Sequence, residues 1–378
     1  MSDIKKLSSL VFIKSREKGL LSLAHNREKS LVPVFGKPRV LDYYIAPLIS
    51  SGFRNVSVIM DRDAPGTREY IVYTYRSNRV KIVDDKDLLR AVSHLSRPGR
   101  NEGILILRAD GIFLPEWEQL YTYLKGLGYG NYGVVDREGN QVGYLIQDGA
   151  PLKKLKSMHL KEEHSSPADQ CWELLQKVVS SEAAPVVCGA AVLKINTVYD
   201  YYNVHFSFLK KAEDFTRVSI LPLMENSREK EFSQVGGSGF VKNSFISDSC
   251  FINGYVQESI LFSNTKVAKG ARVYHSIIMG NNNIGEGAEI KNSIICDNGE
   301  LFARVSPNIG ERARIGSDRP WGTNERYPDF IYGGITLVGQ NVEIPRGFRV
   351  SGNCYIASNT EKAQLKERKE ILSGESVE

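Results

Sequence analysis

Two groups of charged residues follow apolar runs that are typical of β-strands, and they are the first candidates for a ligand site. The segment KSREKGL, residues 14–20, comes after the run LVFI at residues 10–13 and carries three cations. Asp110 ends a second run, ILILRAD, at residues 104–110. Cations can offset the charge of a phosphate. A phosphorylated small molecule is therefore a plausible ligand.

Each of these residues also has a structural interpretation. Asp110 at a strand end could simply cap the turn or helix that follows. Three cations follow the segment at residues 14–20 and could be solvated surface charges: Lys29, Lys37 and Arg39. The two histidines of HLKEEH, residues 159–164, are five positions apart, about 140° around a helix, so they cannot share one face as a zinc-binding pair must. We interpret that segment as helix surface.

Both candidate positions depend on a predicted sheet. Short apolar runs at residues 10–13, 56–60, 80–83 and 104–110 are separated by stretches long enough for crossover helices. This alternation predicts an α/β domain with an open, Rossmann-like, mostly parallel sheet over residues 1–235. Ligands of such sheets bind beyond the carboxyl ends of the strands, where Lys14 and Asp110 would lie. We interpret the run GGSG at 236–239 as a flexible linker that closes this domain.

The second half of the chain contains an internal repeat. Units that begin at Val256, Val273 and Ile290 step by 17 residues, and each has a serine three positions in, followed by two aliphatic residues. Within a unit the apolar positions recur at about six residues, the hexapeptide pattern of a parallel β-helix. We predict this domain over residues 236–360 and a charged, solvated helical tail over residues 361–378.

Composition argues against several classes of protein. The chain has 49 basic and 44 acidic residues and a formal net charge of +5, without a block of like charge, so nucleic acid is not an expected partner. Five widely spaced cysteines without a C-x-x-C pair argue against a disulfide framework and a zinc site. No run reaches the roughly 18 apolar residues of a membrane helix, and no signal peptide pattern is present. We therefore expect a cytoplasmic protein without a membrane partner.

This domain order resembles the sugar-phosphate nucleotidylyltransferases, and within them ADP-glucose pyrophosphorylase (glucose-1-phosphate adenylyltransferase). The segment REKSLVPVFGKPRVLDYYIAPLISSGFRNV, residues 27–56, aligns without a gap with that family's R-A-K-P-A-V-P-F-G-G-K-Y-R-I-I-D-F and S-G-I-R-R-I patterns. The resemblance implies a nucleotidyltransferase domain followed by a left-handed parallel β-helix, like that of the repeats HSIIMGNNNIGEGAEIKNSIICDN. The matching residues are Lys29, Val32, Pro33, Gly36, Lys37, Arg39, Asp42, Ser51, Gly52 and Arg54.

The same comparison indicates that the phosphate loop is degenerate. The family's G-G-x-G-T-R-L falls on residues 14–20, where side chains replace glycines and Gly19 replaces an arginine. Glycines there let the backbone approach a phosphate, and Glu17 adds a negative charge where a triphosphate would lie. Arg16 and Leu20 match the motif. The resemblance therefore leaves Arg16 and Lys29 as remnants of the nucleotide and phosphate loop.

The metal and sugar sites are also incomplete by this comparison. Asp110 falls on the Mg²⁺-binding aspartate of the family's G-D-H-x-Y, but Ser219 takes the place of the second metal aspartate. The sugar-gripping E-K-P has no counterpart, and Asp148 falls where its lysine belongs. Gly189 keeps a glycine that the family uses near the sugar. No catalytic set is intact, and Asp110 remains as a vestigial metal ligand.

Two functional hypotheses follow from the resemblance. The first is a non-catalytic, GlgD-type regulatory subunit that assembles with a catalytic ADP-glucose pyrophosphorylase subunit into a hetero-oligomer, such as a tetramer, and modulates ADP-glucose synthesis for glycogen. It requires no cofactor. Arg39 and Lys37 are its candidates for binding a phosphorylated small-molecule effector, because Arg39 matches a position implicated in effector binding near the family's domain junction. The second is an active sugar-1-phosphate nucleotidylyltransferase with a rebuilt loop and Mg²⁺ at Asp110. A stand-alone effector-sensing scaffold fits the same residues.

Overall fold

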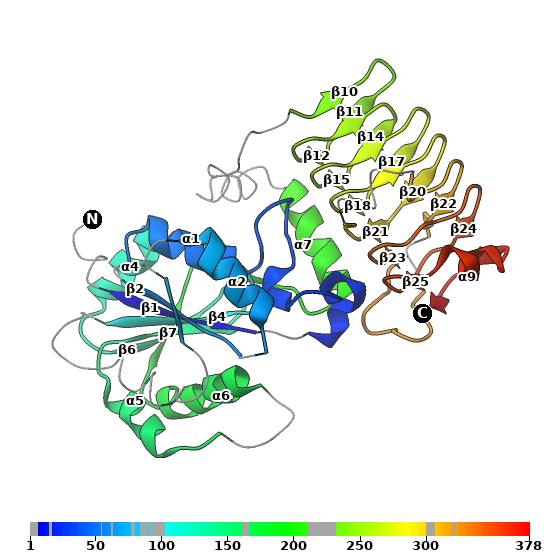
Figure 1. The fold of residues 1–378 in the computed structure, drawn as a ribbon. Coiled ribbons are helices and arrows are strands. Elements are labelled where there is room, and N and C mark those ends of the chain that lie inside the picture. Colours follow the sequence, from blue (N-terminus) through cyan, green and yellow to red (C-terminus); the bar gives the residue numbers. More distant parts are fainter. Residues whose placement is uncertain are drawn as a thin grey trace.

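The computed structural model contains two bodies, a sheet domain and a β-helix (Figure 1). Helix α7, Val198–Lys210, lies between them. None of the helices in the described residues is long and apolar enough to cross a membrane. The structure describes residues 7–14, 17–53, 55–61, 63–76, 80–83, 89, 92, 103–160, 166–210, 232–299, 307–319 and 322–378.

The sheet domain is built on a seven-stranded sheet in the order β3-β2-β1-β4-β7-β6-β8. β1 is parallel to β2 and β4, whereas β7 is antiparallel to both of its neighbours, β4 and β6. The predicted α/β domain with a mostly parallel sheet is confirmed. The strands are β1 (Ser8–Ile13), β2 (Asn55–Ile59), β3 (Val80–Val83), β4 (Ile104–Ala109), β6 (Asn131–Val135), β7 (Gln141–Ile146) and β8 (Ala184–Val187).

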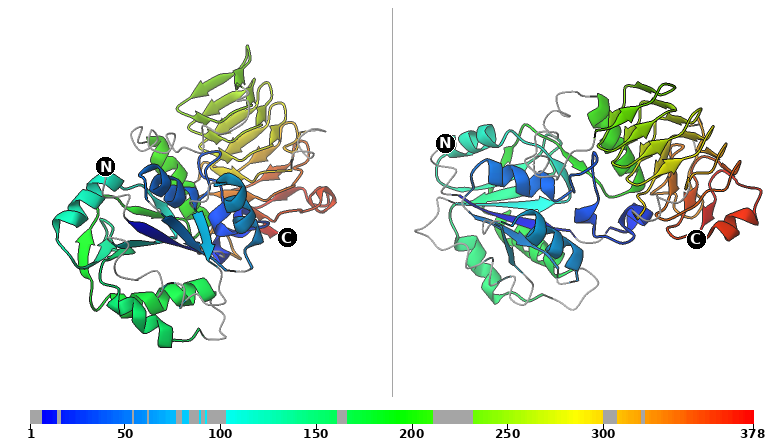
Figure 2. Two further views of the ribbon diagram at one scale, coloured as in Figure 1. Left: turned by 60° about the vertical axis from the view of Figure 1, so that its left-hand side comes forward. Right: turned by 45° about the horizontal axis from the view of Figure 1, so that its top comes forward.

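Helices cover both faces of this sheet (Figure 2). Leu10 and Phe12 of β1 pack with Trp172 of α6 in one apolar cluster, while Val11 and Ile13 pack with α1 in another. Because both faces are buried, the parallel strands are continuous apolar runs in the sequence. The helices of this domain are α1 (Asp42–Ser50), α2 (Pro65–Thr74), α4 (Trp117–Gly126), α5 (Ala150–Lys154), α6 (Pro167–Val179) and α7.

A small second sheet extends the carboxyl end of β4. It pairs β5, Gly111–Phe113, with β9, Val192–Lys194, in antiparallel fashion. The backbones approach closely at Gly111, where a Cβ would lie 2.2 Å from the carbonyl oxygen of Leu193. This pairing brings the turn after β9 beside Asp110.

The second body consists of parallel sheets of short strands, consistent with the predicted left-handed β-helix. The register confirms the 17-residue repeat, since Val256 pairs with Val273. The repeated serines stack on one another: the backbone N–H of Ser276 donates to Ser259 Oγ at 3.2 Å, and that of Ser293 donates to Ser276 Oγ at 3.2 Å. The second aliphatic residue after each serine packs in the interior of the β-helix, whereas the first belongs to the apolar cluster shared with the sheet domain.

The β-helix strands fall into three sheets. The first contains β10 (Gln234–Val235), β13 (Phe251–Ile252), β16 (Lys266–Val267) and β19 (Asn283–Ile284). The second contains β11 (Phe240–Lys242), β14 (Tyr255–Gln257), β17 (Arg272–Tyr274), β20 (Glu289–Lys291), β22 (Arg314–Ile315), β24 (Arg349–Val350) and β26 (Glu370–Ile371). The third contains β12 (Phe245–Ile246), β15 (Ile260–Leu261), β18 (Ile277–Ile278), β21 (Ser293–Ile295), β23 (Thr336–Val338), β25 (Tyr355–Ile356) and β27 (Ser376–Val377).

The prediction of a flexible linker at residues 236–239 is wrong. β10 precedes these residues and already pairs with β13 of the β-helix. The glycine run is therefore a corner of the first coil. A Cβ at Gly239 would lie 2.2 Å from the carbonyl oxygen of Ile252, so close packing between coils requires glycine there.

The C-terminal segment also differs from the predicted helical tail over residues 361–378. Only the five residues of α9, Lys362–Lys366, are α-helical. β26 and β27 then extend the second and third sheets of the β-helix. Leu365, Ile371 and Val377 are buried in the core of that domain, so this segment forms its last coil.

A loop of the sheet domain reaches across to the β-helix beside α7. The ring of Phe35 stacks on His205 of α7 with 4.9 Å between centroids and contacts Phe245 of β12 at 5.8 Å. The Phe35 N–H donates to His205 Nε2 at 3.2 Å, and His205 Nδ1 donates to the carbonyl of Tyr201 at 2.8 Å. One ring nitrogen accepts and the other donates, so His205 is neutral. Burial lowers the pKa of His205 to about 4.

We predict that His205 makes the fold less stable in mild acid. Its folded-state pKa of about 4 lies below the ordinary histidine value of 6.5. The neutral ring therefore stabilises the fold fully above pH 6.5, and this contribution is lost as the pH falls from 6.5 toward 4. His205→Gln keeps a donor and an acceptor but cannot be protonated. Urea unfolding at pH 7 and pH 5 should show that the wild type loses about 2 kcal/mol more than this variant; equal losses would contradict the prediction.

Candidate functional site

A buried lysine holds several polar groups together at the carboxyl ends of β1 and β4. Lys29 begins a short 3₁₀ helix, Lys29–Leu31, and its side chain is 0% exposed. Lys29 Nζ lies 2.8 Å from Asp110 Oδ1, 2.8 Å from Asn196 Oδ1 and 3.7 Å from Glu17 Oε2. Lys14 Nζ lies 2.7 Å from the same oxygen of Glu17. We call these five residues the Lys29 cluster.

Charges within the Lys29 cluster compensate one another. Burial opposes ionisation of Asp110, but the Lys29 ammonium overcomes this effect and holds the pKa of the carboxyl below its usual range. Burial lowers the pKa of Lys29, and Asp110 offsets part of that change. The distance of 2.8 Å between Lys29 Nζ and Asp110 Oδ1 is typical of a charge-assisted hydrogen bond. Loss of either partner would leave a buried charge without its counterion, which is costly.

The segment aligned with the family's phosphate loop packs closely against its surroundings. Lys14 follows β1, and Glu17 precedes a 3₁₀ segment over Lys18–Ala24; Arg16 lies outside the described residues. A Cβ on Gly19 would lie 2.3 Å from the carbonyl oxygen of Asn196. An arginine at position 19 would fit only if the backbone at Asn196 moved away. The segment is thus held by side chains and by tight packing at Gly19.

The Lys29 cluster does not fit a divalent metal ion. Mg²⁺ requires several oxygen ligands in octahedral geometry, but the ammonium of Lys29 already contacts both carboxylates, Asp110 and Glu17. Within the described ranges, no three or more histidine, cysteine, aspartate or glutamate side chains form a group that could hold a metal. Ser219, aligned with the second metal aspartate, lies outside those ranges.

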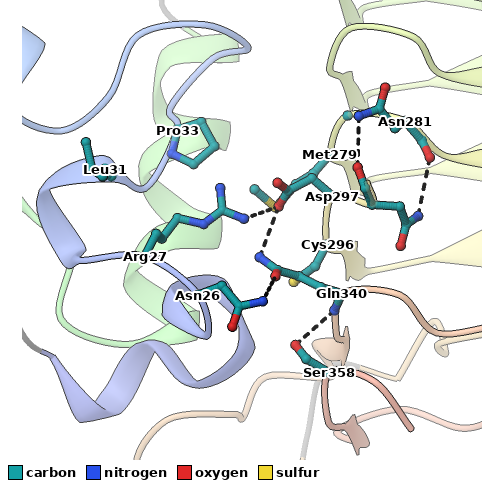
Figure 3. A network of polar contacts seen from close by, with 12 residues as sticks. Asn26, Arg27, Leu31, Pro33, Met279, Asn281, Cys296, Asp297, Gln340 and Ser358 are labelled. Atoms are coloured by element: carbon teal, nitrogen blue, oxygen red, sulfur yellow. Dashed lines mark hydrogen bonds and ion pairs between the residues drawn. The ribbon is translucent and has the colours of Figure 1, made fainter. Parts of the chain in front are cut away.

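A pocket of about 400 Å³, the interdomain pocket, lies between the sheet domain and the β-helix. Arg27 and Arg39 line it from the sheet domain, and Asp297 lines it from the β-helix. Arg27 Nη2 lies 2.5 Å from Asp297 Oδ1, and Figure 3 shows the two side chains meeting across the gap between the ribbons. The other lining residues are Asn26, Leu31, Tyr70, Asn298, Gly299, Gln340 and Asn341.

This pocket offers positive charge and amide groups. Asp297 compensates Arg27, whereas the guanidinium of Arg39 contacts neutral groups: it donates to the carbonyl of Leu31 at 3.1 Å and lies 5.9 Å above the ring of Tyr70. Several amide side chains line the walls. Guanidinium and amide donors together suit an anionic oxygen ligand such as a phosphate.

Lys37 and Gly189, two further residues of the predicted set, lie elsewhere. Lys37 Nζ forms an ion pair of 2.5 Å with Asp248 of the β-helix and does not line the interdomain pocket. Gly189 is exposed, and its carbonyl accepts a hydrogen bond from Arg137. Nothing lies within 4 Å of a Cβ built on Gly189, so packing does not require glycine there.

Arg27 was not among the predicted ligand residues, although it lines the pocket. Its place at the start of the segment that carries the resemblance is the one signal that could have found it. Its partner, Asp297, is 270 residues away in the β-helix, so no local pattern joins the two. The fold does bring the predicted residues Lys29 and Asp110 together and places Arg39 in the interdomain pocket.

We predict that Lys29→Met destabilises the protein more than Lys29→Met combined with Asp110→Asn. The single change leaves two carboxylates, Asp110 and Glu17, without their shared cation, and breaking a buried ion pair costs about 3 kcal/mol or more. Neutralising Asp110 as well should restore about half of that loss. Urea unfolding at pH 7 of the wild type, both single variants and the double variant measures the coupling. Additive effects would mean that the pair is not coupled.

Comparisons with known proteins agree with this architecture. Residues 230–338 match a family described as GlmU-like, C-terminal hexapeptide. A glucose-1-phosphate adenylyltransferase of Acetivibrio thermocellus is 27% identical over 195 residues, which are 49% of this chain and 42% of that protein. The similarity thus spans less than half the length of that relative. The two matches agree with a chain in which a sheet domain is followed by hexapeptide repeats.

Proposed function

We propose that this chain is a regulatory, non-catalytic subunit of glucose-1-phosphate adenylyltransferase, of the GlgD type, which modulates ADP-glucose synthesis for glycogen. The observation that carries the proposal is the ion pair of 2.8 Å between Lys29 and Asp110. It engages the carboxylate that would otherwise be available to a metal. The similarity to a glucose-1-phosphate adenylyltransferase supports the choice of that enzyme as the catalytic partner.

The Lys29 cluster works against catalysis in two ways. Nucleotidyl transfer needs a metal held by carboxylates and cations aimed at the phosphates. Asp110 would have to exchange Lys29 for the metal, and the released ammonium would lie beside the incoming ion. Glu17 would face the triphosphate, and like charges at contact distance repel. Both steps require breaking close ion pairs, of 2.7 Å for Lys14 with Glu17 and 2.8 Å for Lys29 with Asp110.

The interdomain pocket supports the regulatory part of the proposal. A phosphorylated small molecule could bind between Arg27 and Arg39, because guanidinium groups form paired, charge-assisted hydrogen bonds with phosphate. It would compete with Asp297 for Arg27. Since the pocket has walls from both bodies, its occupant would contact the sheet domain and the β-helix at once. A ligand at that position could act as an effector by changing the orientation of the sheet domain relative to the β-helix.

The open end of the β-helix is the surface that we propose for a catalytic partner in a hetero-oligomer. β10, β11 and β12 are the first described strands of their sheets and have one neighbour each (Figure 1). Apolar side chains at this end are well exposed: Phe232 89%, Val235 57%, Phe240 49% and Phe251 43%. Unpaired strand edges and clustered apolar surface are typical of interaction sites.

An active enzyme with a rebuilt loop is the second candidate. In this alternative Lys14, Arg16 and Lys18 would replace the backbone donors to a phosphate. Lys18 is exposed at the start of the 3₁₀ segment, Lys14 would have to leave Glu17, and Arg16 lies outside the described residues. This alternative also needs Mg²⁺ at Asp110. The Lys29 ion pair is the observation against it.

An assay of ADP-glucose formation from ATP and glucose 1-phosphate with Mg²⁺ separates the candidates. We expect no product from the purified chain alone, and a changed rate or effector response when it is mixed with a catalytic homologue from the same source. The reason is that Lys29 holds Asp110 away from the metal. Product from the lone chain that disappears in Asp110→Ala would refute the non-catalytic role. No effect in the mixture would refute the regulatory role and favour a stand-alone scaffold.

We also predict that Phe240→Asp weakens assembly with the catalytic subunit by about tenfold or more, because a buried, unpaired charge at an interface is costly. Tyr123→Asp on α4 is the matched control, since that ring is 55% exposed and lies in the sheet domain. Sedimentation or size-exclusion chromatography with mass detection measures the dissociation constant of the mixture. Equal behaviour of the two variants would rule out the open end of the β-helix as the interface.

A further inference from the structure

Asp42 lies directly behind the interdomain pocket, although it does not line it. Its side chain is 0% exposed at the start of α1. Oδ2 accepts from the backbone N–H of Arg39 at 2.7 Å and from the Tyr70 hydroxyl at 2.8 Å, and Oδ1 accepts from the Tyr75 hydroxyl at 2.7 Å. Arg39 and Tyr70 both line the pocket. The carboxylate thus holds the pocket wall from inside the sheet domain.

The charge of Asp42 is sensitive to its surroundings. Burial raises the pKa of its carboxyl to about 6, against the lowering effects of the three hydrogen bonds and of the positive charge on Arg39. The group is therefore ionised at pH 7 and close to its midpoint in slightly acidic solution. A modest change in the local charge is enough to alter its protonation.

We propose that anion binding in the interdomain pocket is coupled to proton uptake by Asp42, so that the pocket binds anions more tightly as the pH falls below neutral. The coupling rests on the proposed function, in which this pocket receives a phosphorylated ligand. It adds a regulatory property to that site, because each of the two, the effector and the proton, would strengthen binding of the other.

The physical basis is that the ligand and Asp42 share the positive charge of Arg39. An anion on this guanidinium brings negative charge close to a carboxylate that is shielded from water, and the protonated form of Asp42 is then favoured. Linkage is reciprocal, so protonation of Asp42 strengthens anion binding by the same factor.

Protonation changes the charge of Asp42 without removing its contacts. A carboxylic acid keeps acceptor capacity and gains one O–H donor, and a tyrosine hydroxyl can accept as well as donate. The protonated group can still accept from the N–H of Arg39 while it donates to the hydroxyl of Tyr70 or Tyr75. The pocket wall therefore keeps its shape, and the effect of pH appears as a change in affinity.

The groups packed against Asp42 do not compete with it as proton acceptors in this range. Burial raises the pKa values of Tyr43, Tyr70 and Tyr75 well above the usual tyrosine value. Arginine side chains stay protonated, so Arg39 and Arg27 keep their charge. Among the described residues, three further titratable groups lie near the pocket: Asp297 lines it, His25 precedes Asn26, and the carboxylate of Glu28 would lie 2.9 Å from a Cβ on Gly66 of α2. All three are tested by control variants, with Glu28→Gln for the last.

Sulfate is the probe for this coupling because it remains a dianion between pH 5 and pH 8. Calorimetric titration of the full chain at constant ionic strength should give a sulfate affinity about five- to tenfold tighter at pH 5 than at pH 8. The Asp42→Asn variant has no titratable group at this position, so it should lose most of this difference in affinity. His25→Asn, Asp297→Asn and Glu28→Gln should keep the difference, whatever they do to the affinity itself.

A second variant keeps the test decisive even if Asp42→Asn does not fold. Tyr75→Phe removes one donor from the carboxylate without touching the pocket, so it should move the midpoint of the pH dependence to higher pH. An unshifted midpoint there, or an equal pH dependence in the wild type and Asp42→Asn, would overturn the coupling. Sulfate binding that does not depend on pH but is lost in Arg39→Ala would overturn the coupling and would still support an anion site in the interdomain pocket. Absence of binding, or binding indifferent to Arg39→Ala, would overturn both.

Discussion

The buried ammonium of Lys29 fixes three parts of the chain that are far apart in the sequence. It binds Asp110 at the end of β4 and Asn196 after β9, and it lies 3.7 Å from Glu17 in the loop after β1. A charge shielded from water must be compensated on the spot, so these three groups cannot move independently. The loop, the strand end and the turn before α7 therefore form one unit.

The domain junction continues from this unit. α7 begins two residues after Asn196 and carries Tyr201, whose hydroxyl donates to the carbonyl of Pro33 at 2.8 Å. The loop held in this way leads directly to the residues of the interdomain pocket. A second connection runs through Ser22, whose Oγ lies 3.0 Å from the Tyr355 hydroxyl of the β-helix. The Lys29 cluster and the interdomain pocket are thus held in place by the same contacts.

Residues interpreted from the sequence as separate remnants turn out to be partners of one another. Lys29 and Asp110 are 81 positions apart, and their ion pair follows from the parallel pairing of β1 with β4 and from the turn after β9. Glu17 was expected to repel a triphosphate, and in the structure its charge is compensated by Lys14 and Lys29. In the segment that aligns with the family's phosphate loop, side-chain ion pairs thus compensate the charges within the chain.

The sequence by itself determined the two kinds of domain, because apolar runs and a 17-residue repeat are local consequences of burying neighbouring side chains on one surface. It also singled out Lys29, Asp110 and Arg39. Only the tertiary structure decided that the glycine run forms a corner, that the charged tail forms the last coil, that Arg27 meets a carboxylate of the β-helix and that Asp42 supports the pocket wall. The reason is physical: these features depend on close packing and charge compensation between distant segments, which local periodicity does not encode.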